Sequence, residues 1–128
     1  MLLIDKFSGK PVYEQIVEGI ERHILLGVYP VGGAVPSVRE LSASLGINPN
    51  TIQKSYVELT RRGVICPSPG SGCYVTPYAA EKIRECARER LKELEALSAE
   101  LILSGLDEEE ILEAVRRGIS QRSGQGGH

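Results

Sequence analysis

A chain of 128 residues with 41% hydrophobic and 25% charged residues is long enough for one compact domain with an appendage, and this composition excludes a wholly disordered protein. It contains no run of about 18 apolar residues and begins MLLIDKFSGK, so we predict no membrane span, no signal peptide and no membrane partner, and expect a cytoplasmic protein. The three cysteines lack CxxC or CxxH spacing, which predicts reduced thiols and argues against a disulfide framework or a structural zinc site.

The net charge of −2 is unevenly distributed along the chain. Residues 36–77 carry four basic and two acidic residues, a net charge of +2. Residues 1–35 (three basic, four acidic) and 78–128 (eight basic, eleven acidic) are net −1 and −3. A single positive segment in an acidic protein favours a local contact with nucleic acid more than the total charge does.

A first helix is predicted from Pro11 to Leu26. Proline suits its first turn, and Gly27 suits its end. Apolar residues recur in this segment at a spacing of mostly four: Val12, Ile16, Ile20, Ile24 and Leu25. The sequence VYPVGGAV that follows predicts a loop leading to a short extended segment.

A second helix is predicted to begin at Pro36 and Ser37 and to end at Gly46. The hydroxyl of Ser37 and a glutamate three residues later, Glu40, form a capping-box pattern. Its buried stripe is Val38, Leu41 and Leu45, and Ile47 is expected to enter the core between this helix and the next.

A third helix is predicted from Asn48 to Gly63. Either Asn48 or Asn50 can cap its start, since an asparagine oxygen accepts hydrogen bonds from free backbone amides, and Pro49 is tolerated in the first turn. The buried face is expected to consist of Ile52, Tyr56 and either Val57 or Leu59. The second and third helices would then form a helix-turn-helix.

The segment VICPSPGSGCYV predicts a hairpin of two short strands with a loop longer than two residues. Cys66 and Cys73 lie on its opposite strands and can face each other. We expect them to serve packing, with a redox role left open. Three helices followed by a hairpin predict a winged helix-turn-helix, so the fold class is mainly α with a small β-wing.

From Tyr78 the pattern becomes that of one helix of about 25 residues with a single apolar seam, followed after Gly105 by a last helix. About 50 residues cannot bury two apolar faces without a partner, which predicts a two-helix dimerisation segment. The predicted organisation is a winged helix-turn-helix DNA-binding domain at 1–77, a two-helix dimerisation domain at 78–122 and a disordered tail at 123–128.

The polar side chains at the starts of the second and third helices are the candidate DNA-binding residues. The major groove is about 12 Å wide and accepts one helix, whose first turns meet base edges. Amides there can pair with adenine, threonine can touch thymine, and lysine or arginine can reach guanine or phosphate. Free backbone amides at both helix starts also bind phosphate. The candidates are Ser37, Arg39, Asn48, Asn50, Thr51, Gln53 and Lys54.

Plainer interpretations of the same residues stay open. The Asn48-Pro49-Asn50 segment can be a turn and cap alone, and Lys54 an ordinary solvated side chain. The Arg61-Arg62 pair can contact phosphate or can simply suit a helix C-terminus. Tyr56 fits a core or hinge position, although its hydroxyl could reach a phosphate.

The combination of PSVREL, LGINPNTIQKSY and RRG resembles the DNA-binding domain of the GntR family of bacterial transcription regulators, from about Pro11 to Val75, and the short two-helix segment resembles its YtrA subfamily. The resemblance implies a homodimeric, repressor-like regulator of a palindromic operator on double-stranded DNA, commonly one governing a transporter operon. In several relatives the position of Pro49 or Gln53 is an arginine, which leaves the half-site sequence open. The family's DNA contacts fall by position on Arg39, Asn48, Asn50, Thr51 and Gln53, and its wing-tip glycine on Gly70.

The alternative function is a winged-helix protein-interaction module without DNA binding, favoured by the negative net charge and the uncharged wing. An enzyme is not expected, because the sequence lacks HxxxH, DxD and GxSxG motifs and a glycine-rich phosphate loop. No cofactor and no metal are predicted, and a small-molecule effector is unknown.

Overall fold

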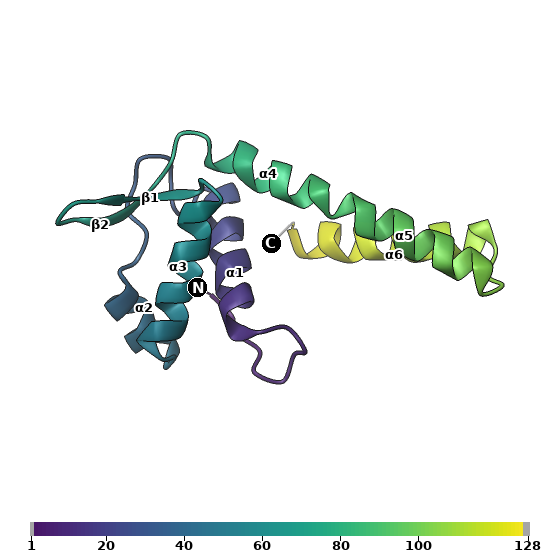
Figure 1. Cartoon of the computed structure of the whole chain (residues 1–128), viewed down its shortest axis with the longest axis horizontal. Coiled ribbons are helices and arrows are strands. Elements are labelled where there is room, and N and C mark those ends of the chain that lie inside the picture. Colours follow the sequence, from purple (N-terminus) through teal and green to yellow (C-terminus); the bar gives the residue numbers. More distant parts are fainter. Residues whose placement is uncertain (1, 127–128) are drawn as a thin grey trace. The chain divides into compact units, whose positions relative to one another are not determined.

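The computed structural model describes residues 2–126 of the chain and the side chains of residues 2–121. It divides into two compact units, Met1–Ala87 and Arg88–His128. The helix that spans this division is α4 (Ala79–Glu89), whereas the sequence placed the boundary before it, at 77/78. Figure 1 labels the elements in chain order.

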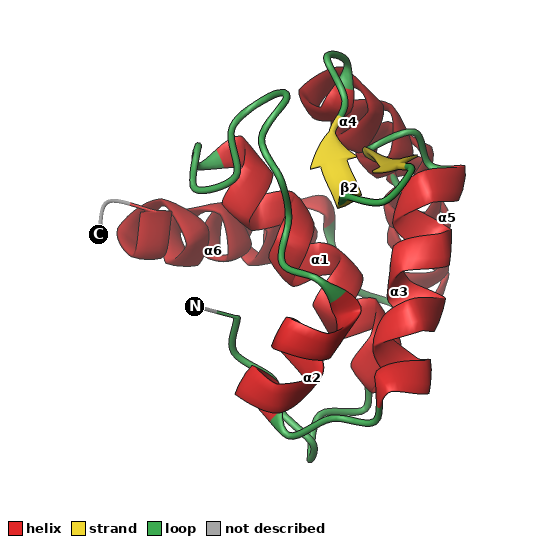
Figure 2. Cartoon of the chain, turned by 90° about the vertical axis from the view of Figure 1, so that its left-hand side faces the viewer, coloured by secondary structure: helices red, strands yellow, loops and turns green. Residues whose placement is uncertain are grey.

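The first unit contains three helices, a two-stranded antiparallel sheet and most of α4 (Figure 2). This confirms the predicted fold class, mainly α with a small β-wing. The short turn between α2 and α3 produces the predicted helix-turn-helix, and the hairpin follows α3 directly. The elements are α1 (Val12–Leu25), α2 (Val38–Leu45), α3 (Pro49–Arg61), β1 (Ile65–Ser68) and β2 (Gly72–Val75).

Side-chain caps fix the starts of α2 and α3. The Ser37 Oγ accepts a hydrogen bond of 3.0 Å from the backbone amide of Glu40, as predicted. Of the two candidate caps for α3, the structure selects Asn48, whose Oδ1 accepts a bond of 2.8 Å from the amide of Asn50. Pro49 is the first residue of this helix, where its missing amide hydrogen costs nothing.

The core of the first unit lies between α1, α2, α3 and the hairpin. Ile16, Ile20, Ile52 and Leu59 are fully buried in it. Val57, the alternative to Leu59, is 58% exposed. At about 100° per residue, Leu59 returns to the side of Ile52 after two turns, whereas Val57 falls on the opposite side of the helix.

The hairpin register separates the two cysteines. Cys66 pairs with Tyr74, and Pro67 pairs with Cys73. Because directly paired residues share a face and neighbours along a strand alternate, Cys66 and Cys73 point to opposite faces. The expectation that these thiols face each other is therefore wrong by one register position. The extended segment before α2 joins the sheet through the Ala34–Tyr74 bridge and a bond from the Val35 amide to the Cys73 carbonyl.

The second unit contains α5 (Leu91–Leu103) and α6 (Glu108–Gly126), which pack against each other. The predicted single helix is interrupted at Arg90, between α4 and α5, and neither a glycine nor a proline explains the break. A reciprocal capping box starts α6: the Asp107 Oδ1 accepts from the Glu110 amide, and the Glu110 carboxylate accepts from the Asp107 amide.

α6 runs past the end that the sequence predicted. It is helical through Gly126, whereas the sequence placed a tail from residue 123. The last two residues of the predicted tail, 127–128, lie outside the described residues. None of the helices between residues 2 and 126 combines the length and apolar character of a membrane span.

Candidate nucleic-acid interface

The third helix presents one buried and one exposed face. Its inner face packs Ile52, Tyr56 and Leu59 into the core. The predicted contacts Asn50, Gln53 and Lys54 are all exposed, and Thr51 is half-buried. Spacings of three and four place the exposed side chains in one stripe along the helix. The exposed residues from the cap to the last turn are Asn48, Pro49, Asn50, Gln53, Lys54, Val57, Thr60 and Arg61.

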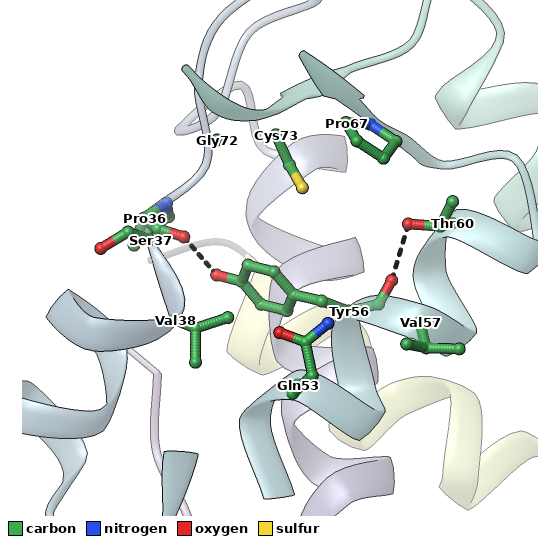
Figure 3. A pocket seen from close by; sticks show the side chains of 10 residues that line it. All are labelled: Pro36, Ser37, Val38, Gln53, Tyr56, Val57, Thr60, Pro67, Gly72 and Cys73. Carbon is green, nitrogen blue, oxygen red and sulfur yellow. Dashed lines mark hydrogen bonds between the residues drawn. The ribbon is translucent and has the colours of Figure 1, made fainter. Parts of the chain in front are cut away.

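The start of α2 is held against the middle of α3. The hydroxyl of Tyr56 donates a hydrogen bond to the Pro36 carbonyl (Figure 3). Burial raises the pKa of Tyr56, so the hydroxyl keeps its proton and stays a donor. This geometry favours the core role for Tyr56 over phosphate contact. It also positions Ser37, half-buried at the cap, and Arg39, exposed in the first turn.

A cavity of about 410 Å³ opens between the start of α2, the flank of α3 and the wing. Two predicted site residues meet there, Ser37 and Gln53. The Cys73 side chain points from the wing towards the Tyr56 ring (Figure 3). The lining residues are Pro36, Ser37, Val38, Gln53, Tyr56, Val57, Thr60, Pro67, Gly72 and Cys73.

Lys54 leans towards α1. Its Nζ lies 3.9 Å from the centroid of the Tyr13 ring, a cation–π contact, while the neighbouring Ser55 Oγ donates a bond of 2.9 Å to the Tyr13 carbonyl. Gln53 borders the cavity, so the two side chains diverge to either side of the stripe. Sequence reasoning missed Tyr13, because its partners lie on a helix distant in the chain.

The two arginines at the end of α3 are engaged with carboxylates. The Arg61 Nε lies 2.9 Å from Glu58 Oε1, and the Arg62 Nε lies 2.7 Å from Glu58 Oε2. Hydrogen bonds from Arg61 and then Arg62 lower the pKa of Glu58 to about 2. These contacts favour the structural interpretation of the pair. The i, i+3 and i, i+4 spacing of these residues was a sequence signal for them.

Arg62 also reaches across to α1, where its Nη1 lies 3.4 Å from both carboxylate oxygens of Glu21. Glu21 is only 8% exposed. Burial raises the pKa of this carboxyl group, and Arg62 opposes that shift only in part. The sequence carried no sign that this glutamate is buried, since its neighbours in α1 include other charged residues.

The wing tip is a tight turn built on Gly70. Its φ of 76° is a left-handed conformation that glycine adopts without strain, and the Ser71 amide donates to the Ser68 carbonyl at 2.9 Å. No charged residue occurs between Ile65 and Val75, so the tip offers backbone amides and hydroxyls only. Gly70 does not border the cavity, unlike its neighbour Gly72.

The Cys73 thiol is not activated. Burial raises its pKa, so it is protonated at neutral pH, when a reactive cysteine would be a thiolate. Within the described part of the chain, no group of three or more His, Cys, Asp or Glu side chains is arranged to hold a metal ion. Cys73 therefore fits packing better than redox chemistry.

The cations available to a ligand are few. Of the four basic residues in the positive segment, Arg61 and Arg62 are paired with Glu58. Arg39 and Lys54 have no carboxylate within salt-bridge distance among the described residues. An exposed helix with amide side chains, flanked by one free arginine and one lysine, is suited to reading a polar groove.

Comparison with known proteins identifies the same segment. A model of bacterial regulatory proteins of the gntR family matches residues 12–75. The HTH-type transcriptional repressor YtrA of Bacillus subtilis is 35% identical over 117 residues, which cover 91% of this chain and 90% of that protein. The family and this relative are transcription regulators, in agreement with the prediction that the chain is not an enzyme.

Solved structures agree with this match. A GntR family transcriptional regulator from Listeria monocytogenes aligns with a TM-score of 0.68 and 34% identity, covering 89% of this chain and 98% of that one. The DNA-binding domain of AraR in complex with operator ORR3 aligns with a TM-score of 0.50 and 25% identity, over 59% of this chain and 95% of that one. The similarity thus extends to a domain solved on DNA.

Proposed function

Because this chain belongs to the GntR family of bacterial regulatory proteins, we propose that it represses transcription by binding, as a homodimer, a palindromic operator on double-stranded DNA. Its role as a transcriptional regulator with a winged helix-turn-helix DNA-binding domain follows from the family. Repression, the dimer and the operator are the proposal. We place the protein in the cytoplasm, and the family resemblance suggests a transporter operon as its target.

The observation that carries this proposal is the exposed polar stripe of α3. Asn50 and Gln53 project from a helix whose opposite face is fixed in the core by Ile52 and Leu59. A helix that is rigid on one side and polar on the other can enter the major groove without repacking the domain.

We assign the contacts by chemistry and position. The exposed amides of Asn50 and Gln53 would pair with adenine edges, and Lys54 and Arg39 would reach guanine or phosphate. Thr51 would add a hydroxyl contact near the helix start. Three further residues complete the proposed interface through the first turns of α2 and α3 and the tip of the wing: Ser37, Pro49 and Gly70.

Asn48 has a mixed role in this scheme. Its side-chain oxygen is already used as the cap of α3, so it stays available only through its amide NH₂ group and through the first-turn backbone that it orders. The first turn of α3 offers few free backbone amides to a phosphate, because Pro49 has none and the amides of Asn50 and Thr51 already bond to Asn48. Asn48 would therefore support DNA binding mainly by shaping this turn.

The second unit supports the homodimer. Between Arg88 and Gln121, where side chains are described, none is buried. Apolar residues remain exposed on both helices, and a two-helix unit without a core of its own is unstable in water. A second copy of the chain would cover them. The exposed apolar residues are Leu91, Leu94, Leu97, Ile102, Leu103, Leu106, Leu112 and Ile119.

A protein-interaction module without DNA binding is the second candidate, and one observation favours it. Arg61 and Arg62 are both paired with Glu58, and Arg62 also with Glu21, so the first unit offers fewer unpaired cations to phosphate than its sequence suggests. Phosphate neutralisation supplies most non-specific DNA affinity. The two candidates therefore differ in one respect. For the regulator, contacts between the polar stripe of α3 and base edges must supply enough binding free energy for DNA binding despite the few phosphate contacts.

An electrophoretic mobility-shift assay with the full-length protein distinguishes the two candidates. The probe is a duplex that covers the region upstream of the protein's own gene, and the competitor is an unrelated duplex of equal length. We expect one shifted species at low salt that resists a roughly thousandfold excess of competitor and weakens steeply as salt rises. Equal competition by both duplexes, or no shift at low salt, would contradict the proposal and favour the interaction module.

A further inference from the structure

Val57 is an apolar side chain on the wrong side of α3 for a core residue. Of the exposed residues from Asn50 to Arg61, all of which the structure describes, it alone is apolar. It is 58% exposed, while the neighbouring Tyr56 is 4% exposed. Single exposed apolar residues are common on protein surfaces, so what matters for Val57 is which surface it belongs to.

The neighbours of Val57 identify the surface to which it belongs. It follows Gln53 by about one helical turn, and both border the cavity between α3 and the wing (Figure 3). Asn50 precedes Gln53 by a further turn on the same exposed face. Val57 therefore continues the polar stripe that is proposed to enter the major groove, and what covers the stripe would cover Val57 as well.

The chemistry of the major groove offers one apolar group on a base edge, the C5-methyl of thymine. Cytosine has a hydrogen at that carbon. Its exposed N4 amino group is a hydrogen-bond donor, and a valine side chain has no acceptor for it. Resting on the proposed function, we infer that Val57 is a specificity residue that packs against the C5-methyl of a thymine in each operator half-site. It would select thymine by contact area, whereas Gln53 and Asn50 select by hydrogen bonds.

The test removes the methyl group from the DNA instead of from the protein. Full-length protein first selects duplexes from a random pool, and each thymine of the enriched operator is then replaced by deoxyuridine in both half-sites. One methyl contact contributes a factor of about four in affinity per half-site, so the wild-type dimer should lose roughly fifteenfold at one symmetric pair of positions. Replacement at the other thymines should change affinity less than twofold.

The Val57→Ala variant should be insensitive at that same pair, with less than a twofold difference between thymine and deoxyuridine. Val57→Thr keeps one methyl group at nearly the same volume and should respond to an intermediate extent. Val28→Ala is the matched control, because Val28 is 56% exposed and lies outside α3. This control should show the full wild-type loss on deoxyuridine.

Three outcomes would overturn the inference. The enriched half-sites could contain no thymine, the wild-type protein could bind thymine and deoxyuridine duplexes equally at every position, or Val57→Ala could lose the same factor as the wild type. In each case the selected operator would still stand, and with it the proposed function. A pool from which no sequence is enriched would instead overturn the proposed function, and this inference with it.

Discussion

The hydroxyl of Tyr56 donates a hydrogen bond to the carbonyl oxygen of Pro36, and this bond joins the middle of α3 to the residue before the cap of α2. The phenol ring is buried, so the bond is shielded from water. It sets the distance between the two helix starts that carry the proposed DNA contacts. A single side chain thus links the core of the domain to the geometry of its binding surface.

Tyr56→Phe should therefore destabilise the protein and weaken DNA binding. Removing the hydroxyl leaves the Pro36 carbonyl without its partner, at a cost of about 1 kcal/mol in the free energy of unfolding. Urea denaturation followed by circular dichroism measures this loss. Tyr78→Phe is the control, because Tyr78 is 65% exposed, and its change should stay within about 0.5 kcal/mol. Equal stability of the two variants would show that the bond contributes nothing.

The two asparagines at the start of α3 should separate into a structural and a functional residue. Asn48→Ala removes the cap and should lower the free energy of unfolding by about 1 kcal/mol. The Asn50 side chain is exposed, so Asn50→Ala should keep the stability and relax the preference for operator over unrelated DNA by roughly tenfold. Chemical denaturation and competition binding on both variants give the comparison. Reversed effects would mean that the wrong asparagine has been assigned to the cap.

Glu58 should stabilise the protein at neutral pH and lose this effect in acid. Its pKa lies near 2 in the folded protein, below its ordinary value of 4.5, so its contribution is present above about pH 4.5 and is lost as the pH falls towards 2. Glu58→Gln should cost about 0.5–1 kcal/mol at pH 7, and the difference from wild type should shrink below pH 4.5. Denaturation curves at pH 7, 4 and 3 measure it. A difference that does not change with pH would contradict the ion-pair explanation.

Glu21 should behave in the opposite way. Burial raises its pKa, so the folded protein favours the protonated carboxyl group, and this contribution to stability is lost as the pH rises through the raised pKa. Glu21→Gln should therefore be neutral or slightly stabilising at pH 7, since a neutral amide avoids the burial of a charge. The same denaturation series tests this. A loss of more than about 1 kcal/mol would show that the Arg62 contact outweighs the burial.

Salt dependence should distinguish a free arginine from a paired one. Arg39 has no carboxylate partner among the described residues, so Arg39→Ala should reduce the slope of log affinity against log salt by about one per protomer. Arg61 is already paired with Glu58, and Arg61→Ala should change the slope much less. Titrations at several salt concentrations provide both slopes. Equal reductions would place Arg61 among the phosphate contacts.

The association of two chains should depend on the apolar residues of α5. Leu97 is 51% exposed in the single chain, and Leu97→Lys should yield a monomer by light scattering and weaken operator binding at least tenfold. Glu95→Lys, an exposed position in the same helix, is the charge control and should stay dimeric. A wild-type chain that is monomeric at working concentrations would contradict the proposed homodimer.

Much of the first unit was predictable from local sequence. Several local features depend on residues only a few positions apart in the chain. They are the helix starts at Ser37 and Asn48, the glycine that ends α2 and the hairpin around Gly70. Short-range interactions of this kind produce a recognisable pattern of residue types in the sequence. The exposed amides of the third helix followed from its period of 3.6 residues. The sequence by itself thus determined the element order and the polar surface of α3.

The tertiary structure decided what depends on residues far apart in the chain. The Tyr56–Pro36 bond, the Lys54–Tyr13 contact and the Glu21–Arg62 pair each join different segments. A period-2 strand pattern allows more than one pairing, so the register that separates Cys66 from Cys73 emerged only from the paired strands. Such contacts form between surfaces that meet only after the chain has folded, and no local pattern of residue types encodes which ones meet.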